Sequence, residues 1–414
     1  MKKIYSTFTA AFIALFCIVG FVCAKPAPWP VAPEYINPVG NEIPMVASYI
    51  FYDDSPVTTE FLKDIRRAGF NMFRASMHEP ALKNTLSVME GTDMKMMMYL
   101  WEALDTTKTL RMVNKYKRSP YIASYFVKDE PRAHQFQDLK KLNDLFRQAD
   151  STKLNYINLL PAVDASDLRS RDYETYVSDY VRTVNPSMIS FDCYPIVTPN
   201  GKDYVHDMTY ETMETISKIS KESERPFWAY ILITQMPPYP KPKREYIRFQ
   251  MFLALAYGAQ GFNYYTYCLP DFDRKKGRYS NSPIDNKGQR TDVWYMVRDV
   301  NQEVQNLKGV FLGAETINVS LTGPKLPKYT KKLKELPSPF KKLSSTGEGL
   351  IVSHFKNGSE EYLLLVNRDI LNSQKVNYTL SGSTTRVYSD TDKRKVSGNS
   401  LTLTPGGYAI FQIK

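Results

Sequence analysis

Eight short apolar runs alternate with helical segments between residues 45 and 267, and this alternation constrains the fold most strongly. The runs are rich in β-branched and aromatic residues, which is typical of buried strands. The intervals between them are long enough to hold the crossover helix that parallel strands require. The expected strands are Met45–Tyr52, Phe70–Ser76, Met94–Trp101, Ile122–Glu130, Leu154–Pro161, Met188–Pro195, Phe227–Thr234 and Gly261–Tyr267.

The first interval between runs illustrates the helical pattern. Apolar residues repeat at helical spacing from residue 61 to residue 68. Thr58 or Thr59 is placed to cap the start, and Gly69 follows the end. Eight such units predict a (β/α)8 TIM barrel. A doubly wound open sheet is the structural alternative, but no glycine-rich phosphate loop follows the first strand.

The pattern changes after about residue 309, where helical periodicity stops. A segment rich in proline and lysine, residues 324–339, leads into short strand-like runs. Two of these runs, Gly349–Phe355 and Glu361–Val366, flank Asn357-Gly358, a strong hairpin signal. Further runs follow at Arg386–Tyr388, Leu401–Leu403 and Tyr408–Ile413. We therefore expect a catalytic barrel over residues 25–308 and a small antiparallel β-sandwich over residues 309–414.

The first 24 residues have the features of a secretory signal peptide. Two lysines precede an apolar stretch from Phe8 to Val22, and Ala24 offers a small residue for cleavage. The stretch is too short for a membrane span, and no later segment is apolar enough. We expect a secreted or periplasmic protein. Outside the signal only Cys193 and Cys268 remain, which excludes a disulfide scaffold and leaves open whether these two pair.

The formal net charge is +11, and basic residues cluster at 241–248, 274–278 and 325–342. Solvated surface is the simplest explanation, and attraction to an anionic polymer is the alternative. Because export argues against nucleic acid, an acidic or sulfated glycan would be the partner in that case. The chain also contains 29 Tyr and 21 Phe. Such rings fill cores, and they also provide platforms on which sugars stack.

The sequence Asp129-Glu130-Pro131 closes the fourth expected strand. Proline cannot donate to a strand ladder, so the strand is expected to end there. Two adjacent carboxylates would then stand at the carboxyl end of a barrel strand, where catalytic groups of this fold lie. A turn-capping Asp129 and a solvent-exposed Glu130 are the alternative without chemistry.

Acids and aromatic residues recur at the other strand ends. Asp192, within Phe191-Asp-Cys-Tyr-Pro195, is the best further candidate, whereas the seventh strand is followed by Gln235 and no acid. Carboxylates among aromatic rings suit a carbohydrate site, since a carboxylate pair cleaves a glycosidic bond without a cofactor. The four histidines lack metal-ligand spacing, so no metal is expected. The expected sugar-binding residues are Trp101, Tyr194, Trp228, Gln235 and Tyr265.

The chain resembles secreted TIM-barrel glycoside hydrolases near the family 42 β-galactosidases. The segments that carry the resemblance are AGFNMFR at 68–74, SPYIASYFVKDEP at 119–131, NPSMISFDCYPI at 185–196, FQMFLALAYGAQGFNYYTY at 249–267, NQEVQNLKGVFLG at 301–313 and LTLTPGGYAIFQI at 401–413. The resemblance implies a barrel fold and O-glycoside hydrolysis of a polysaccharide or host glycan. It also implies that Glu130 is the general acid/base.

Two departures separate the chain from that clan. An Asn normally precedes the acid/base Glu, where this chain has Asp129, and the clan's nucleophilic Glu on strand seven is missing. Asp192, or a Glu that reaches in from a loop, would then be the nucleophile. The Asp-Glu pair is also similar to that of hexosaminidases of families 20 and 123, in which the Asp orients the substrate's acetamido group and no second catalytic carboxylate is needed. A glycan-binding barrel without activity and a lyase for uronic-acid glycans are the remaining alternatives.

Overall fold

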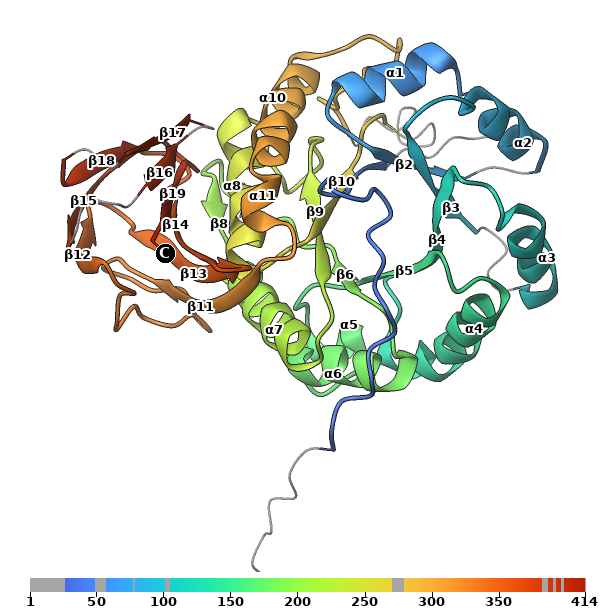
Figure 1. The fold of residues 1–414 in the computed structure, drawn as a ribbon, viewed down its shortest axis with the longest axis horizontal. Coiled ribbons are helices and arrows are strands. Elements are labelled where there is room, and N and C mark those ends of the chain that lie inside the picture. The colour runs from blue at the N-terminus through green and yellow to red at the C-terminus, as the bar shows by residue number, and fades with distance from the viewer. Residues whose placement is uncertain are drawn as a thin grey trace, which may run out of the picture.

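The computed structural model describes residues 27–48, 57–76, 79–100, 105–269, 279–381, 386–389, 392–395 and 398–413. The expected signal peptide and Trp101 lie outside these residues. The described chain forms a closed barrel of eight parallel strands followed by antiparallel sheets (Figure 1). The predicted TIM barrel and C-terminal β-sandwich are therefore confirmed, and the open-sheet alternative is wrong because β1 pairs with β10 and closes the barrel.

All eight predicted runs contain a barrel strand, although most strands are shorter than the runs. In chain order the barrel strands are β1 (Met45–Ser48), β2 (Met72–Ser76), β3 (Lys95–Tyr99), β4 (Ile122–Asp129), β5 (Leu154–Leu159), β6 (Ile189–Phe191), β9 (Phe227–Leu232) and β10 (Gly261–Tyr265). A two-stranded hairpin, β7 (Ile196–Val197) with β8 (Tyr204–Val205), follows β6. Barrel strands of this kind place their carboxyl ends on one face, here called the mouth; the opposite end is called the base.

Amphipathic helices surround the barrel strands. They are α1 (Thr59–Arg67), α2 (Glu79–Val88), α3 (Thr106–Tyr116), α4 (Phe136–Ala149), α5 (Ala165–Leu168), α6 (Tyr173–Val184), α7 (Met208–Glu222), α8 (Arg244–Tyr257), α10 (Asp292–Asn306) and α11 (Lys308–Phe311). In α1 the hydroxyl of Thr58 accepts a hydrogen bond from the backbone N–H of Phe61, as expected for an N-cap. Leu62 and Ile65 are buried against the barrel, so the predicted apolar stripe is the packing face.

The antiparallel part consists of two sheets. The larger contains β11 (Glu315–Leu321), β13 (Leu350–Asn357), β14 (Glu360–Asn367), β19 (Tyr408–Gln412), β16 (Arg386–Ser389) and β17 (Asp392–Lys395). The smaller contains β12 (Phe340–Ser345), β15 (Gln374–Leu380) and β18 (Ser400–Leu403). Asn357 and Glu360 pair across the β13–β14 turn, which confirms the Asn357-Gly358 hairpin. The larger sheet packs on α8, where Phe252 and Tyr408 stack with ring centroids 3.6 Å apart.

Residues 27–44 run across the base of the barrel before entering β1 (Figure 1). Near the start of this segment, Trp29 lies under the guanidinium of Arg182 at 4.0 Å. Further along, the hydroxyl of Tyr35 accepts a hydrogen bond of 3.1 Å from the indole N–H of Trp228. The base is therefore covered by the chain itself.

Candidate active site

A bulge near the end of β4 sets which side chains enter the mouth. Phe126 pairs with Tyr156 of β5, whereas Lys128 pairs with Ile157 and Asp129 with Asn158, so one extra residue separates the pairs. Ile157 belongs to the layer between barrel and helices. Lys128 therefore faces outward with Ile157, and Asp129 faces the barrel interior with Asn158. A bulge re-aims side chains in this way beside functional sites.

Glu130 follows β4 directly and has a left-handed backbone, with φ +43°. Its N–H donates to the carbonyl of Asn158 at 2.9 Å, and its own carbonyl accepts from Arg132 Nη1 at 2.8 Å. A non-glycine residue in this region is strained, and the two hydrogen bonds hold it there. The backbone conformation thus fixes the position from which the Glu130 side chain extends, at the rim of the mouth.

Three carboxyl groups come together at this rim, on the ends of β4 and β6. Burial first, and then the charge of Asp129, raise the pKa of Glu130, while Arg132 acts in the opposite direction. Burial, followed by the charges of Glu130 and Asp129, raises the pKa of Asp192 well above its ordinary value. Carboxyls that share one site cannot all ionise cheaply. Glu130 and Asp192 are therefore the members of the cluster in which the proton is favoured.

Asn158 of β5 connects the acids and was missed by the sequence reasoning. Its Nδ2 donates to Asp129 Oδ1 at 3.2 Å, and its Oδ1 accepts from the Ser190 hydroxyl at 3.2 Å. Its side chain also hydrogen-bonds Asp192. The other carboxylate oxygen, Asp192 Oδ1, is buried without a hydrogen-bond partner among the described residues. A buried oxygen without a partner is costly, so this oxygen is an unsatisfied acceptor within the acidic cluster.

An aromatic wall stands beside the acids. Tyr194 contacts Tyr239 edge-on at 5.4 Å and stacks with Tyr265 at 6.3 Å, and Tyr265 contacts Tyr279 at 6.2 Å. Burial, with the charges of Cys193, Asp192 and Glu130, raises the pKa of Tyr239 to about 12. The structure thus brings Tyr194 and Tyr265 together, as the sequence predicted, and adds Tyr239 and Tyr279. Phenolic rings of this kind offer apolar faces and a hydroxyl each.

Gln235 lies after β9, the seventh barrel strand, but it is engaged by its own neighbours. Its backbone pairs with Ser280 in both directions, at 2.8 and 3.0 Å. Its Oε1 accepts from Asn281 Nδ2 at 2.6 Å. The described part of this loop brings no carboxylate to the seventh strand end. Gln235 therefore ties two mouth loops together.

Trp228 does not lie at the mouth. It is the second residue of β9, its exposure is 0%, and its indole N–H is bonded to Tyr35 beneath the barrel. A fully buried ring has no face for a sugar, so this placement contradicts a role of Trp228 in a sugar subsite. Aromatic content marked the strand correctly, but the position within the strand decides which end of the barrel a side chain occupies.

Cys193 and Cys268 are both buried, and they do not form a disulfide with each other. Within the described residues, no group of three His, Cys, Asp or Glu is arranged to hold a metal ion. Among the helices that the structure describes, none has the length and apolar character of a membrane span.

A cavity of about 760 Å³ lies near the base, lined by Tyr35, Phe227, Tyr257 and Gly313 among others. None of the three clustered acids lines it.

No family model and no curated protein matches the sequence. Solved structures match by fold. One is a family 5 glycoside hydrolase from Bacteroides vulgatus, with a TM-score of 0.55 and 10% identity over 89% of each chain. Another is an α-amylase from Geobacillus thermoleovorans, with a TM-score of 0.52 and 10% identity over 90% of this chain and 98% of that one. 

A β-galactosidase from Marinomonas ef1 matches more loosely, with a TM-score of 0.47 and 12% identity over 65% of this chain. The match covers 60% of that enzyme. At such identities the likeness concerns the fold alone, and the chemistry has to be argued from the site. The chain thus shares its fold with the family 5 glycoside hydrolase and the α-amylase.

Proposed function

We propose that the protein is a glycoside hydrolase that cleaves O-glycosidic bonds in a polysaccharide or host glycan, with Glu130 as the general acid/base. The observation that carries the proposal is the position of the Glu130 carboxyl at the mouth, beside Asp129 and Asp192. Its raised pKa favours the protonated form that a general acid needs. The fold shared with glycoside hydrolases agrees with this assignment.

Each neighbour of Glu130 has a separate role in the proposed reaction. Glu130 protonates the oxygen of the leaving sugar as the glycosidic bond breaks. Asp192, whose pKa is also raised, binds a sugar hydroxyl, and its free Oδ1 provides the acceptor. Tyr194 and Tyr265 present rings on which the sugar stacks. Because a protonated carboxyl is a poor nucleophile, the raised pKa of Asp192 disfavours a nucleophilic role for it.

A substrate-assisted hexosaminidase is the second candidate. The specific observation in its favour is the pairing of Asp129 with Asn158, which fixes the aspartate on the inner side of the rim beside Glu130. In such a reaction the substrate's acetamido oxygen attacks the anomeric carbon while Asp129 orients the amide and Glu130 supplies the proton. This scheme requires no carboxylate on the seventh strand.

The test replaces Glu130 with Gln in the full mature chain and measures sugar release from a glycan panel. We expect a loss of about a hundredfold or more, since general acid catalysis contributes about that much. Asp164→Asn is the matched control, because Asp164 is an exposed acid after β5 whose side chain caps no helix. Unchanged turnover in the Gln variant would refute the assignment. Preference for N-acetylated over non-acetylated substrates would select the second candidate.

Export is a separate proposal, which rests on the apolar stretch from Phe8 to Val22 behind two lysines. The mature protein would act outside the cytoplasm and begin at Lys25. N-terminal sequencing of the protein from separated cell fractions tests this directly. Recovery of the uncleaved chain from the cytoplasm would contradict it.

A further inference from the structure

Arg74 lies inside the barrel, below the acids of the mouth. It is the third residue of β2 and only 6% of its surface is exposed. Its guanidinium carbon lies 4.7 Å from the ring centre of Phe126 and 5.8 Å from that of Tyr99. The aromatic rings hold the guanidinium by cation–π contact, which leaves its N–H groups free to bond elsewhere.

The hydrogen bonding of Arg74 is incomplete. Among the described residues its one hydrogen-bond partner is the hydroxyl of Tyr230, at a long 3.3 Å from Nη1. None of the ion pairs between described residues includes Arg74. A guanidinium carries five N–H donors, and burying them without acceptors is unfavourable.

A second buried arginine shows how this chain treats a purely structural guanidinium. Arg225 is 1% exposed and donates to the carbonyls of Pro186, Ser223 and Pro30 and to Oδ1 of Asn185. Its donors are thus supplied by the folded chain. Arg74, at similar burial, has one neutral partner. Within the described residues, Arg74 therefore retains N–H donors that a bound group could use.

The surroundings favour a charged Arg74 that faces the mouth. Burial opposes its charge, but Tyr230 and then Asp129 favour it, and the net result is a raised pKa. Among the acids, Asp129 contributes most to this raised pKa. It pairs with Asn158 and so lies one layer closer to the mouth than Tyr99 and Tyr156, which pair with Phe126. A cation so placed sits beneath any sugar that reaches Glu130.

We propose that Arg74 binds a carboxylate or sulfate group on the sugar that lies deepest in the active site at the mouth, so that the substrate is an acidic glycan. Both groups offer paired oxygens that match the planar fork of a guanidinium. The raised pKa values of Glu130 and Asp192 reduce the negative charge with which these acids oppose an anionic ligand. The basic composition of the chain favours the same class of polymer.

The proposal rests on the proposed function, and binding separates the two. Glu130→Gln protein is titrated by calorimetry with uronic-acid oligosaccharides and their carboxyl-reduced forms, and with sulfated oligosaccharides and their desulfated forms. We expect one acidic member to bind about ten- to a hundredfold more tightly than its neutral counterpart, the usual range for charge-assisted hydrogen bonds. The two pairs distinguish carboxylate from sulfate. Equal binding of both members of every pair, or no binding of any acidic member, would overturn the proposal.

Variants then locate the preference. Arg74→Met is expected to remove it, Arg74→Lys to restore it in part, and Arg169→Met, which removes an exposed arginine, to leave it unchanged. A preference that survives Arg74→Met in protein with a wild-type circular dichroism spectrum would refute the role of Arg74. If Arg74→Met fails to fold, the wild-type comparison of paired oligosaccharides still decides the substrate class. Turnover by Glu130→Gln protein would refute the acid/base assignment and leave the anion site standing.

Discussion

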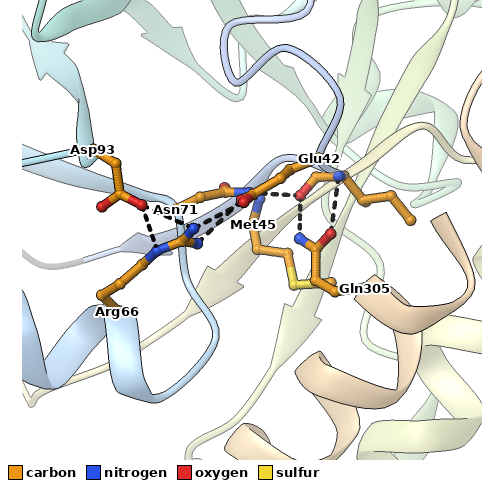
Figure 2. Close-up of polar contacts among 7 residues, drawn as sticks. Glu42, Met45, Arg66, Asn71, Asp93 and Gln305 are labelled. Atoms are coloured by element: carbon orange, nitrogen blue, oxygen red, sulfur yellow. Dashed lines mark hydrogen bonds and ion pairs between the residues drawn. The ribbon is translucent and has the colours of Figure 1, made fainter.

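Carboxyl groups at the two ends of the barrel have opposite environments, and their pKa values are shifted in opposite directions. At the base, Glu42 receives hydrogen bonds from Arg66 Nη2 at 2.8 Å and from Asn71 Nδ2 at 2.8 Å, and Arg66 also bonds Asp93 (Figure 2). These partners, Arg66 above all, lower the pKa of Glu42. At the mouth, burial and neighbouring acids raise the pKa of Glu130 and Asp192.

The contrast separates stability from chemistry. The base network joins the N-terminal segment to α1 and β2. Beside it, Gln305 of α10 accepts a hydrogen bond from the N–H of Ile43 and donates one to the Ile43 carbonyl (Figure 2). The charges of the network are satisfied and hold elements together. Among the described residues, Asp129, Glu130 and Asp192 form no ion pair, and Asn158 is the neutral side chain that hydrogen-bonds Asp129. Ionisable groups with perturbed pKa values cluster at functional sites, which lie at the carboxyl ends of the strands in this fold.

Asp192→Asn should produce the largest change, a gain in the free energy of unfolding at pH 7. The raised pKa means that the folded state holds the proton more tightly than the unfolded state. Stability is therefore lost as pH rises from the unfolded pKa, about 3.9, through the folded one. The amide removes this penalty, so the gain should vanish near pH 3. Chemical denaturation across this range measures it, and a loss of stability at pH 7 would contradict it.

Arg66→Met should act in the opposite direction at the base, with a loss of about 1–2 kcal/mol. The arginine and Glu42 are each about one-third exposed, at 35% and 31%, so screening limits the effect. Because the pKa of Glu42 is lowered, this contribution is present at neutral pH and disappears as pH falls through the folded pKa. Arg67→Met, which removes an exposed ion pair with Glu60, is the control and should cost less than about 0.5 kcal/mol.

Glu130→Gly should be more stable than Glu130→Ala by about 1 kcal/mol. The left-handed backbone of residue 130 penalises any side chain, whereas glycine adopts it freely. At most sites alanine is the more stable of the two. Thermal unfolding of both variants gives the sign, and a more stable alanine variant would show that the site stores no backbone strain. Neither variant should retain the proposed activity.

Asp129→Asn should have the smallest effect, a shift in the pH dependence of turnover. A general acid works while protonated, so activity falls as pH rises through the Glu130 pKa. Asp129 contributes to raising that pKa, and removing its charge should move the alkaline limb to lower pH. Turnover against pH for both proteins tests the shift. If the alkaline limb moved to higher pH in the variant, Glu130 would not be the acid whose pKa is raised by Asp129.

The sequence predicted the barrel because its signals are local. Apolar runs such as Phe227–Thr234 contain their strands with errors of a few residues at the ends. In the sandwich, β11, β12, β15 and β17 were missed. Exposed polar residues interrupt the apolar alternation of β11 and β12, whereas β15 alternates regularly but has only three apolar residues. Strands of that kind depend on pairing partners distant in the chain, which a single sequence does not display.

The candidate site was predicted less completely than the fold. Glu130, Asp129, Asp192, Tyr194 and Tyr265 meet at the mouth because strand ends in a barrel share one face. Asn158 and Arg74 were not predicted. The sequence does not show whether a polar residue within a strand faces the barrel interior or the helices. Trp228 was misplaced for a related reason: it begins a strand, and the early residues of a barrel strand lie at the base.

The bulge in β4 decides the sign of the charge at the mouth. With regular alternation from Phe126, the next two inward positions would be Lys128 and then Glu130, and Asp129 would face the helices. One additional residue reverses this order and presents Asp129 instead. Loss of the bulge at unchanged strand length would thus exchange an anion for a cation at the rim, without any insertion or deletion. Such a change offers a short evolutionary route between sites of opposite polarity on one barrel.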